Sequence, residues 1–270
     1  MGDLRARVVS QLLDTGAAVR ALVREPDSAN LPDEVEVVRV DLSESDTLDA
    51  RLEGVKSVFL LWPFTASEAS AEISPAVVDA ISRHARRIVY LSADAAEEPD
   101  SFWAALERLV EQSGLEGTFL RPTGFAANTL MWAEQIRAGV VVRWPYGAAA
   151  RSLIHERDIA TVAIRALTED RHDGERYVLT GPQTLTQAEQ VRIIGEAIDR
   201  PVRWEELPRE AARQELADAF GDASFADVAL DAWARFVTQP ERVISTVEEV
   251  TGRSARTFRQ WATDHADDFR

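Results

Sequence analysis

Short, largely apolar strands that alternate with helical stretches constrain the fold of this chain more than any other feature. The strands are predicted over residues 18–25, 35–42, 57–62, 87–93 and 117–122, and most of the segments between them have helical periodicity. Strands that carry apolar side chains on both faces are typical of a parallel sheet covered by helices on each side. The sequence therefore predicts an α/β fold with a doubly wound parallel sheet.

The chain opens on a helix where such a sheet has a strand. Leu4, Val8 and Leu12 fall on one helical face, Gly16 ends the helix, and a buried strand follows over residues 18–25. In a sheet of strand order 3-2-1-4-5, that helix follows the central first strand and a glycine-rich turn. We therefore expect the written sequence to be truncated at its start. The alternatives are that the neighbouring strands pair directly or that another segment fills the gap.

The second half of the chain has a different pattern. Helices are predicted over residues 155–170 and 187–200, with Thr186 opening the second of them, and the remainder is mostly helical in character. We therefore divide the chain into a sheet domain over residues 1–150, without its first strand, and a smaller, mainly helical lobe over residues 151–270 packed on it.

Composition excludes several classes of protein. The formal net charge of −16 repels phosphate backbones and anionic membrane surfaces, so neither nucleic acid nor a membrane is expected as a partner. Cysteine is absent, which excludes disulfides, thiolate catalysis and cysteine metal sites. The four histidines show no metal-binding spacing, so no metal is expected. Without a signal peptide or an apolar run that could span a bilayer, the expected location is the cytoplasm.

Ligands of an open parallel sheet bind beyond the carboxyl ends of its strands. Arg24 ends the first visible strand, where a fixed cation with forked donors suits a 2′-phosphate; the alternative is a solvated arginine. Asp41 either contacts an adenine edge or caps the next turn. Trp62 either covers a planar cofactor or, as is more common for such aromatics, belongs to the core. Ser92 either donates to a substrate carbonyl or closes its strand.

Several segments in a fixed order carry a resemblance to a known family. They are VVSQLLDTGAAVRALVRE, VEVVRVDL, VFLLWP, IVYLSA, SGLEGTFLRPTGFAANTL and LIHERDIATVAIRAL. Together they resemble the NmrA-like branch of the atypical short-chain dehydrogenase/reductases over nearly the whole chain. The resemblance implies a Rossmann-like fold with a small C-terminal substrate lobe and NADP (NADPH) as the cofactor. Many members reduce quinones, azo compounds, enones or imines, and others are redox-sensing regulators that act through protein partners.

The resemblance also implies roles for individual residues. Arg24 takes the 2′-phosphate, Asp41 and Leu42 lie on the adenine side, Trp62 and Pro63 line the ribose and nicotinamide, and Ser92 lies beside the nicotinamide. Gly2 corresponds to the middle glycine of the glycine-rich turn, whereas Arg5 stands where the third glycine is expected. Phe125 and Asn128 fall where the substrate pocket opens.

One common mechanism is excluded by the sequence itself. Ordinary short-chain dehydrogenases use Tyr-x-x-x-Lys, in which the lysine lowers the tyrosine pKa for proton transfer. The fourth residues after Tyr90, Tyr146 and Tyr177 are Asp94, Ala150 and Gly181, and Lys56 is the only lysine of the chain. Tyrosine–lysine alcohol oxidation is therefore excluded, whereas direct hydride transfer to an electrophilic acceptor needs mainly positioning.

These observations predict an NAD(P)H-dependent oxidoreductase that reduces a small electrophilic, quinone-like acceptor without a Tyr-Lys pair. Ser92 is the one candidate catalytic residue. The alternatives are a nucleotide-sensing regulatory protein with a protein partner, and a cofactor-free or degenerate Rossmann scaffold. The incomplete glycine-rich turn around Gly2 favours the last of these.

Overall fold

The computed structural model describes residues 2–44, 47–63, 68–220 and 223–270. The chain divides into two compact units. The first unit comprises residues 1–123, 156–179 and 246–253, and the second comprises residues 124–155, 180–245 and 254–270. The predicted division at residue 150 differs from these units, because the chain leaves the first unit after residue 123 and later returns to supply a helix and an edge strand.

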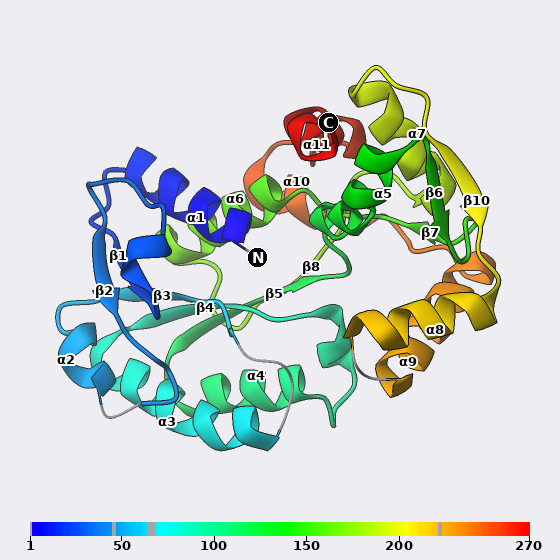
Figure 1. The fold of residues 1–270 in the computed structure, drawn as a ribbon. Coiled ribbons are helices and arrows are strands. Elements are labelled where there is room, and N and C mark those ends of the chain that lie inside the picture. The colour runs from blue at the N-terminus through cyan, green and yellow to red at the C-terminus, as the bar shows by residue number, and fades with distance from the viewer. Residues whose placement is uncertain (1, 45–46, 64–67, 221–222) are drawn as a thin grey trace. The chain divides into compact units, whose positions relative to one another are not determined.

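The first unit is a parallel sheet with helices on both faces (Figure 1). Its main sheet has the order β3 (Ser57–Leu60), β4 (Arg87–Leu91), β5 (Glu116–Pro122) and β8 (Arg176–Leu179). The helices are α1 (Gly2–Asp14) and α6 (Glu156–Thr168) on one face, and α2 (Leu48–Leu52), α3 (Glu68–His84) and α4 (Phe102–Gln112) on the other. Shorter helices of this unit are η1 (Pro26–Ser28), η3 (Asp94–Glu97) and α10 (Thr246–Thr251). The predicted α/β fold is confirmed.

β1 (Arg20–Val23) and β2 (Glu36–Arg39) form a separate parallel pair. β1 and β3 would be the neighbours of the expected first strand. In the part of the chain that the structure describes, β1 pairs with β2 and β3 pairs with β4, but β1 and β3 do not pair with each other. Direct pairing of the two neighbours is therefore not observed, and no described strand pairs with both of them.

α3 contains a proline in its interior. The helix begins at Glu68 and includes Pro75, although proline lacks the N–H that an interior helical position needs. The carbonyl of Ala71 would normally accept from residue 75. It accepts instead from the Ser74 hydroxyl at 3.3 Å, so a side chain compensates in part for the missing backbone donor.

The main apolar core of the first unit lies between the sheet and the helices α3 and α4. Ile88 and Tyr90 of β4 and Phe119 of β5 pack with Leu106 and Val110 of α4, and each of these side chains is fully buried. Burial of such a side chain stabilises a fold by about 1.5–3 kcal/mol. This packing fixes α4 against β4 and β5.

The second unit contains short sheets and helices. β6 (Val141–Trp144) pairs in parallel with β10 (Arg203–Glu206), and β7 (Ala150–Arg151) pairs antiparallel with β9 (Leu185–Thr186). Its helices are η4 (Ala126–Trp132), α5 (Ala133–Ala138), α7 (Gln187–Ala197), α8 (Arg209–Phe220), α9 (Ala223–Thr238), α11 (Phe258–Asp264) and η5 (Ala266–Phe269). The predicted start of α7 is confirmed, because Thr186 and Glu189 form a reciprocal capping box.

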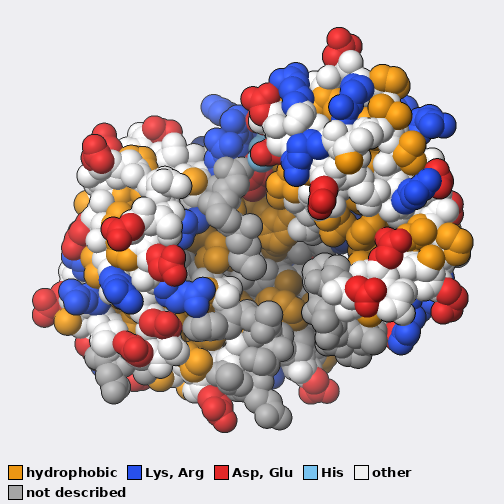
Figure 2. Space-filling model, viewed as in Figure 1, with side chains coloured by type: hydrophobic (Ala, Val, Ile, Leu, Met, Phe, Trp, Pro, Cys, Tyr) orange, Lys and Arg blue, Asp and Glu red, His pale blue; other side chains and the backbone are white. Residues whose placement is uncertain are grey.

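Two apolar clusters form the core of the second unit. The larger contains Trp132, Trp261 and Phe269, and the smaller joins α8 to α9 through Leu216 and Leu230. Figure 2 shows apolar side chains at the surface on the right of the view, over β10 and its neighbours, with acidic side chains close by. Among the described residues, no helix combines the length and apolar character needed to cross a membrane.

Candidate functional site

Arg24 directly follows β1, at the carboxyl end of the strand, and its side chain is exposed. Among the described residues, no hydrogen bond or ion pair engages its guanidinium group. Its charge nevertheless acts on a neighbour, because Arg24 is one of the groups that lower the pKa of Asp41. An unengaged arginine at this edge of the sheet is free to take an anion.

Asp41 caps a turn, which is one of the two roles that the sequence allowed. Its Oδ1 atom accepts hydrogen bonds from the Ser43 hydroxyl at 2.7 Å and from the Ser43 backbone N–H at 2.9 Å. These hydrogen bonds, with a smaller contribution from Arg24, hold the pKa of Asp41 below its usual range. α2 begins further along the chain, at Leu48 after Thr47.

Trp62 and Leu42 lie in the core of the first unit. Trp62 is 6% exposed and its ring centre lies 5.9 Å from that of Phe102, and Leu42 packs against the same apolar cluster. Trp62 thus occupies a core position, which is the second of the two roles that the sequence allowed. An indole so buried does not present its face at the surface. Pro63 is exposed at the end of the described segment after β3. The cofactor contacts of these three residues remain predictions.

Ser92 belongs to a buried polar group at the carboxyl ends of β4 and β5. Its hydroxyl donates to Oε1 of Glu107 at 2.5 Å. Arg121 holds the same carboxylate with two hydrogen bonds, from Nε at 2.9 Å and from Nη2 at 2.5 Å. Ser92 is 4% exposed and Glu107 is 3% exposed, so water competes little for these contacts.

This geometry determines the direction of the Ser92 hydrogen bond. A hydroxyl has one proton, and a carboxylate paired with arginine has none to give, so the Ser92 proton is committed to Glu107. Ser92 then offers only lone pairs to another group. The predicted alternative in which Ser92 donates to a substrate carbonyl therefore does not match this arrangement.

Tyr90 lies two residues before Ser92, on the same face of β4, and close to Glu107. Its side chain is fully buried, and its hydroxyl has no hydrogen-bond partner among the described residues. Burial first, and the Glu107 charge second, raise the pKa of this phenol well above its ordinary value. Tyr90 thus remains a neutral core residue at physiological pH.

The sequence contains a signal for Glu107 that a search for strand-end residues overlooks. Trp103, Leu106 and Val110 lie along one face of α4, and Glu107 occupies the next position of that stripe. A carboxylate on the buried face of a helix needs a cationic partner. Arg121 is that partner, and its strand-end position alone did not indicate the pairing.

The two residues predicted for the substrate pocket lie in the second unit. Phe125 precedes η4 and forms a bridge with Ile154, whereas Asn128 is exposed and its N–H donates to the Phe125 carbonyl at 3.1 Å. They are therefore neighbours on one turn of the chain. Their role as a substrate pocket remains a prediction.

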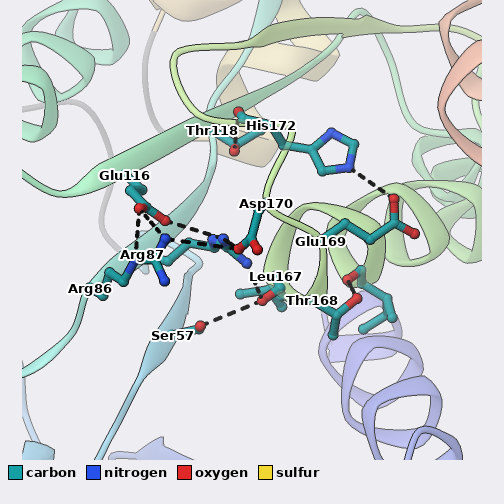
Figure 3. A network of polar contacts seen from close by, with 11 residues as sticks. Ser57, Arg86, Arg87, Glu116, Thr118, Leu167, Thr168, Glu169, Asp170 and His172 are labelled. Carbon is teal, nitrogen blue, oxygen red and sulfur yellow. Dashed lines mark hydrogen bonds and ion pairs between the residues drawn. The ribbon is translucent and has the colours of Figure 1, made fainter.

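A second polar cluster lies at the opposite ends of the same strands (Figure 3). Arg87, at the amino end of β4, is buried and donates to the Leu167 carbonyl at 3.0 Å, to Asp170 at 2.6 Å and to Glu116 at 3.2 Å. Leu167 lies in the last turn of α6, where carbonyls lack helical partners. Ligands of such sheets bind at the carboxyl ends of the strands, so we interpret this cluster as structural.

His172, in this second cluster, is expected to make stability depend on pH. Its Nδ1 atom lies 2.7 Å from the Tyr177 hydroxyl and its Nε2 atom lies 3.5 Å from Glu169, and burial lowers the pKa of the imidazole below its ordinary value. The unfolded chain binds a proton at His172 more readily than the folded chain does. The contribution of neutral His172 to the free energy of unfolding is therefore complete above about pH 6.5 and is lost as the pH falls. Urea unfolding should accordingly show a lower free energy of unfolding at pH 5.5 than at pH 7.5.

The variants His172→Gln and His84→Gln separate this effect from other titrations. His172→Gln should flatten the pH dependence, whereas His84→Gln, which changes a partly exposed histidine beside Asp49, should retain most of it. An unchanged slope in His172→Gln would contradict the assignment. The carboxylates whose pKa values are lowered, such as Asp170, titrate below this pH range and do not interfere.

Comparison with known proteins decides the family. The family model described as NAD(P)H-binding matches residues 2–170, more than half of the chain. The chain belongs to this NAD(P)H-binding family. Its relatives are reductases of the NmrA-like, atypical short-chain type, which confirms the predicted resemblance.

Two curated relatives match this NAD(P)H-binding protein over almost its entire length. The (4-alkanoyl-5-oxo-2,5-dihydrofuran-3-yl)methyl phosphate reductase of Streptomyces griseus is 37% identical over 99% of this chain and 96% of its own. The NAD(P)H azoreductase of Xenophilus azovorans is 33% identical over the same shares. Among solved structures, the Citrobacter triphenylmethane reductase complexed with NADP(H) has a TM-score of 0.80 at 21% identity and covers 97% of this chain and 96% of its own, which supports the Rossmann-like fold.

The first unit of this NAD(P)H-binding protein fits a phosphorylated dinucleotide at its adenosine end. Arg24 is exposed and unengaged at the carboxyl end of β1, and α1 begins at Gly2, so backbone N–H groups of a first helical turn are present. Arg5 lies within α1 in place of the third glycine, and α1 still packs against α6. Within the described ranges, no group of three or more histidine, aspartate or glutamate residues is placed to hold a metal ion.

Proposed function

We propose that this protein is an NADPH-dependent reductase of a small, electrophilic, quinone-like acceptor. The observation that carries the proposal is Arg24, an exposed arginine with no ion-pair partner among the described residues, at the strand end where a 2′-phosphate would bind. In this proposal Arg24 selects NADPH over NADH. In the same proposal, Gly2 and the first turn of α1 hold the pyrophosphate.

The choice of acceptor follows from the lack of a built proton donor at the strand ends that the structure describes. The chain has no Tyr-x-x-x-Lys, and the Ser92 proton is committed to Glu107. NADPH, when bound, supplies a hydride. The acceptor must then be electrophilic without help from a protein acid, and its proton comes from water.

The curated relatives support the same class of acceptor. The Streptomyces relative is named for reduction of an unsaturated oxo-dihydrofuran, and the Xenophilus relative for reduction of azo compounds. Both names describe a conjugated double bond rather than an alcohol or a simple ketone. We therefore propose a conjugated small molecule as substrate, and a cytoplasmic location, where NADPH is regenerated.

The proposal is tested by cofactor binding followed by turnover. We expect NADPH to bind with a lower dissociation constant than NADH, measured by nucleotide fluorescence, and NADPH to be oxidised when a two-ring quinone is added. Binding of NADPH without turnover of quinones, azo compounds or enones would favour the nucleotide-sensing regulator instead. Absence of nucleotide binding by the folded protein would leave the cofactor-free scaffold.

A further inference from the structure

The second unit contains an apolar pocket that neither Phe125 nor Asn128 lines. Its walls come from four separate segments: η4, the end of β6, the residue after β10, and α8. The lining residues are Met131, Trp144, Pro145, Leu207, Ala212, Glu215 and Leu216. All of them belong to the second unit, so the pocket is complete within it.

The pocket lies where the two apolar clusters of this unit meet. Trp144 packs at the edge of both clusters, and its ring centre lies 5.4 Å from that of Trp233. Ala212 and Leu216, which line the pocket, are also buried in the α8–α9 cluster. The walls are therefore formed by packed side chains and are available to a ligand without rearrangement.

The volume of the pocket limits the size of the ligand. It is about 250 Å³. An apolar cavity of roughly 150 Å³ holds one benzene ring, so this pocket has room for two fused rings. Met131 is 44% exposed, so it lies on the open side of the pocket.

One charge lies on this otherwise apolar surface. Glu215 lines the pocket and is exposed, and no hydrogen bond or ion pair to it occurs among the described residues. The neighbouring cations of α8 are already engaged, since Arg209 pairs with Asp231 at 2.8 Å and Arg213 pairs with Asp227 at 2.7 Å. The pocket mouth is therefore negatively charged, which disfavours an anionic substituent.

We infer that this pocket binds a neutral, fused two-ring aromatic group of the substrate and that Glu215 rejects its acidic analogues. The inference deepens the proposed reductase function by naming the part of the acceptor that the second unit recognises. Binding is measured without cofactor, so its failure leaves the reductase proposal standing. Likewise, absence of turnover with binding intact leaves the pocket assignment standing.

The methionine content of the chain provides a direct readout. Met131 is one of only two methionines, the other being Met1, so a methyl-labelled sample gives two signals. Naphthalene-2-carboxamide should shift the Met131 methyl signal through the ring current, saturably and in the range of about 0.1–1 mM, without moving the Met1 signal. The variant Met131→Leu assigns the two signals.

Two substitutions test the location and the charge preference. Met131→Trp should fill the pocket and weaken calorimetric binding of naphthalene-2-carboxamide at least tenfold, whereas Met131→Leu should keep it within about twofold. The isosteric anion 2-naphthoate should bind the wild type more weakly. Glu215→Gln should reduce the ratio of the naphthoate to the carboxamide dissociation constant about fivefold at low salt. The control Glu210→Gln, on another face of α8, should leave this ratio unchanged.

Three results would overturn the inference. An unmoved Met131 signal at saturating carboxamide would show that the pocket takes no such ring. If the wild type binds the carboxamide and the naphthoate equally, Glu215 does not discriminate against the anion. The same conclusion follows if Glu215→Gln and Glu210→Gln have equal effects. Melting curves of Met131→Trp and Met131→Leu establish that both variants are folded before binding is compared.

Discussion

Glu107→Gln is expected to lower the unfolding temperature by about 10 °C. Glu107 is the only acceptor among the described residues for both the Ser92 hydroxyl and the two hydrogen bonds that Arg121 donates to a side chain. Removing one member of a buried ion pair leaves the other charge uncompensated, which costs about 3–5 kcal/mol. For a chain of this size each kcal/mol corresponds to roughly 2–4 °C. Thermal unfolding followed by circular dichroism measures the change.

A neighbour on the same helix serves as the control. Glu111 lies one turn further along α4 and pairs with Arg176, whose Nε atom also lies 3.7 Å from Glu107, but the Glu111 and Arg176 side chains are substantially exposed. Glu111→Gln should therefore cost at most about 1 kcal/mol. The double variant Glu107→Met, Arg121→Leu should recover more than half of the lost stability, because no charge then remains buried. If Glu107→Gln and Glu111→Gln have the same unfolding temperature, the Glu107–Arg121 ion pair is not an important stabilising contact.

Arg24→Glu is expected to reverse the cofactor preference. If Arg24 pairs with the 2′-phosphate, replacing it by a carboxylate substitutes repulsion for a charge-assisted contact. The dissociation constant for NADPH should rise about a hundredfold, equivalent to roughly 2.7 kcal/mol, while that for NADH should change by less than about threefold. Both constants are measured by titration of nucleotide fluorescence at fixed ionic strength.

Arg51→Glu is the matched control for this charge reversal. Arg51 is exposed in the last turn of α2, so its replacement changes the net charge equally. We expect it to leave both dissociation constants within about twofold of the wild type. An unchanged NADPH constant in Arg24→Glu would mean that Arg24 is the solvated arginine that the sequence also allowed.

The sheet could be predicted because its strands are recognisable from their local sequence. Residues such as Ile88 and Tyr90 form uninterrupted apolar runs, and Thr186 with Glu189 is a local capping signal that needs no tertiary information. β10 was missed because Arg203–Glu206 is a polar segment whose pairing partner, β6, lies far away in the sequence. Its strand conformation depends on that partner rather than on its own composition.

The candidate site was harder to predict than the fold, for two physical reasons. Asp41 and Trp62 occupy suitable strand ends, but whether a polar group binds a ligand or its own backbone depends on contacts that sequence spacing does not determine, as the Asp41–Ser43 turn illustrates. The pocket around Trp144 and Glu215 combines four distant segments. No local pattern brings such segments together, so only the folded chain reveals it.

The interleaved course of the chain has a consequence for protein synthesis. The edge strand β8 and the helix α10, which packs on α6 and β8, lie far along the chain, α10 at Thr246–Thr251. The first unit therefore acquires its last pieces only when nearly the whole polypeptide has left the ribosome. Until β8 has emerged, β5 lacks its neighbour on one side, so the nascent chain exposes an unfinished sheet edge that can pair with other chains.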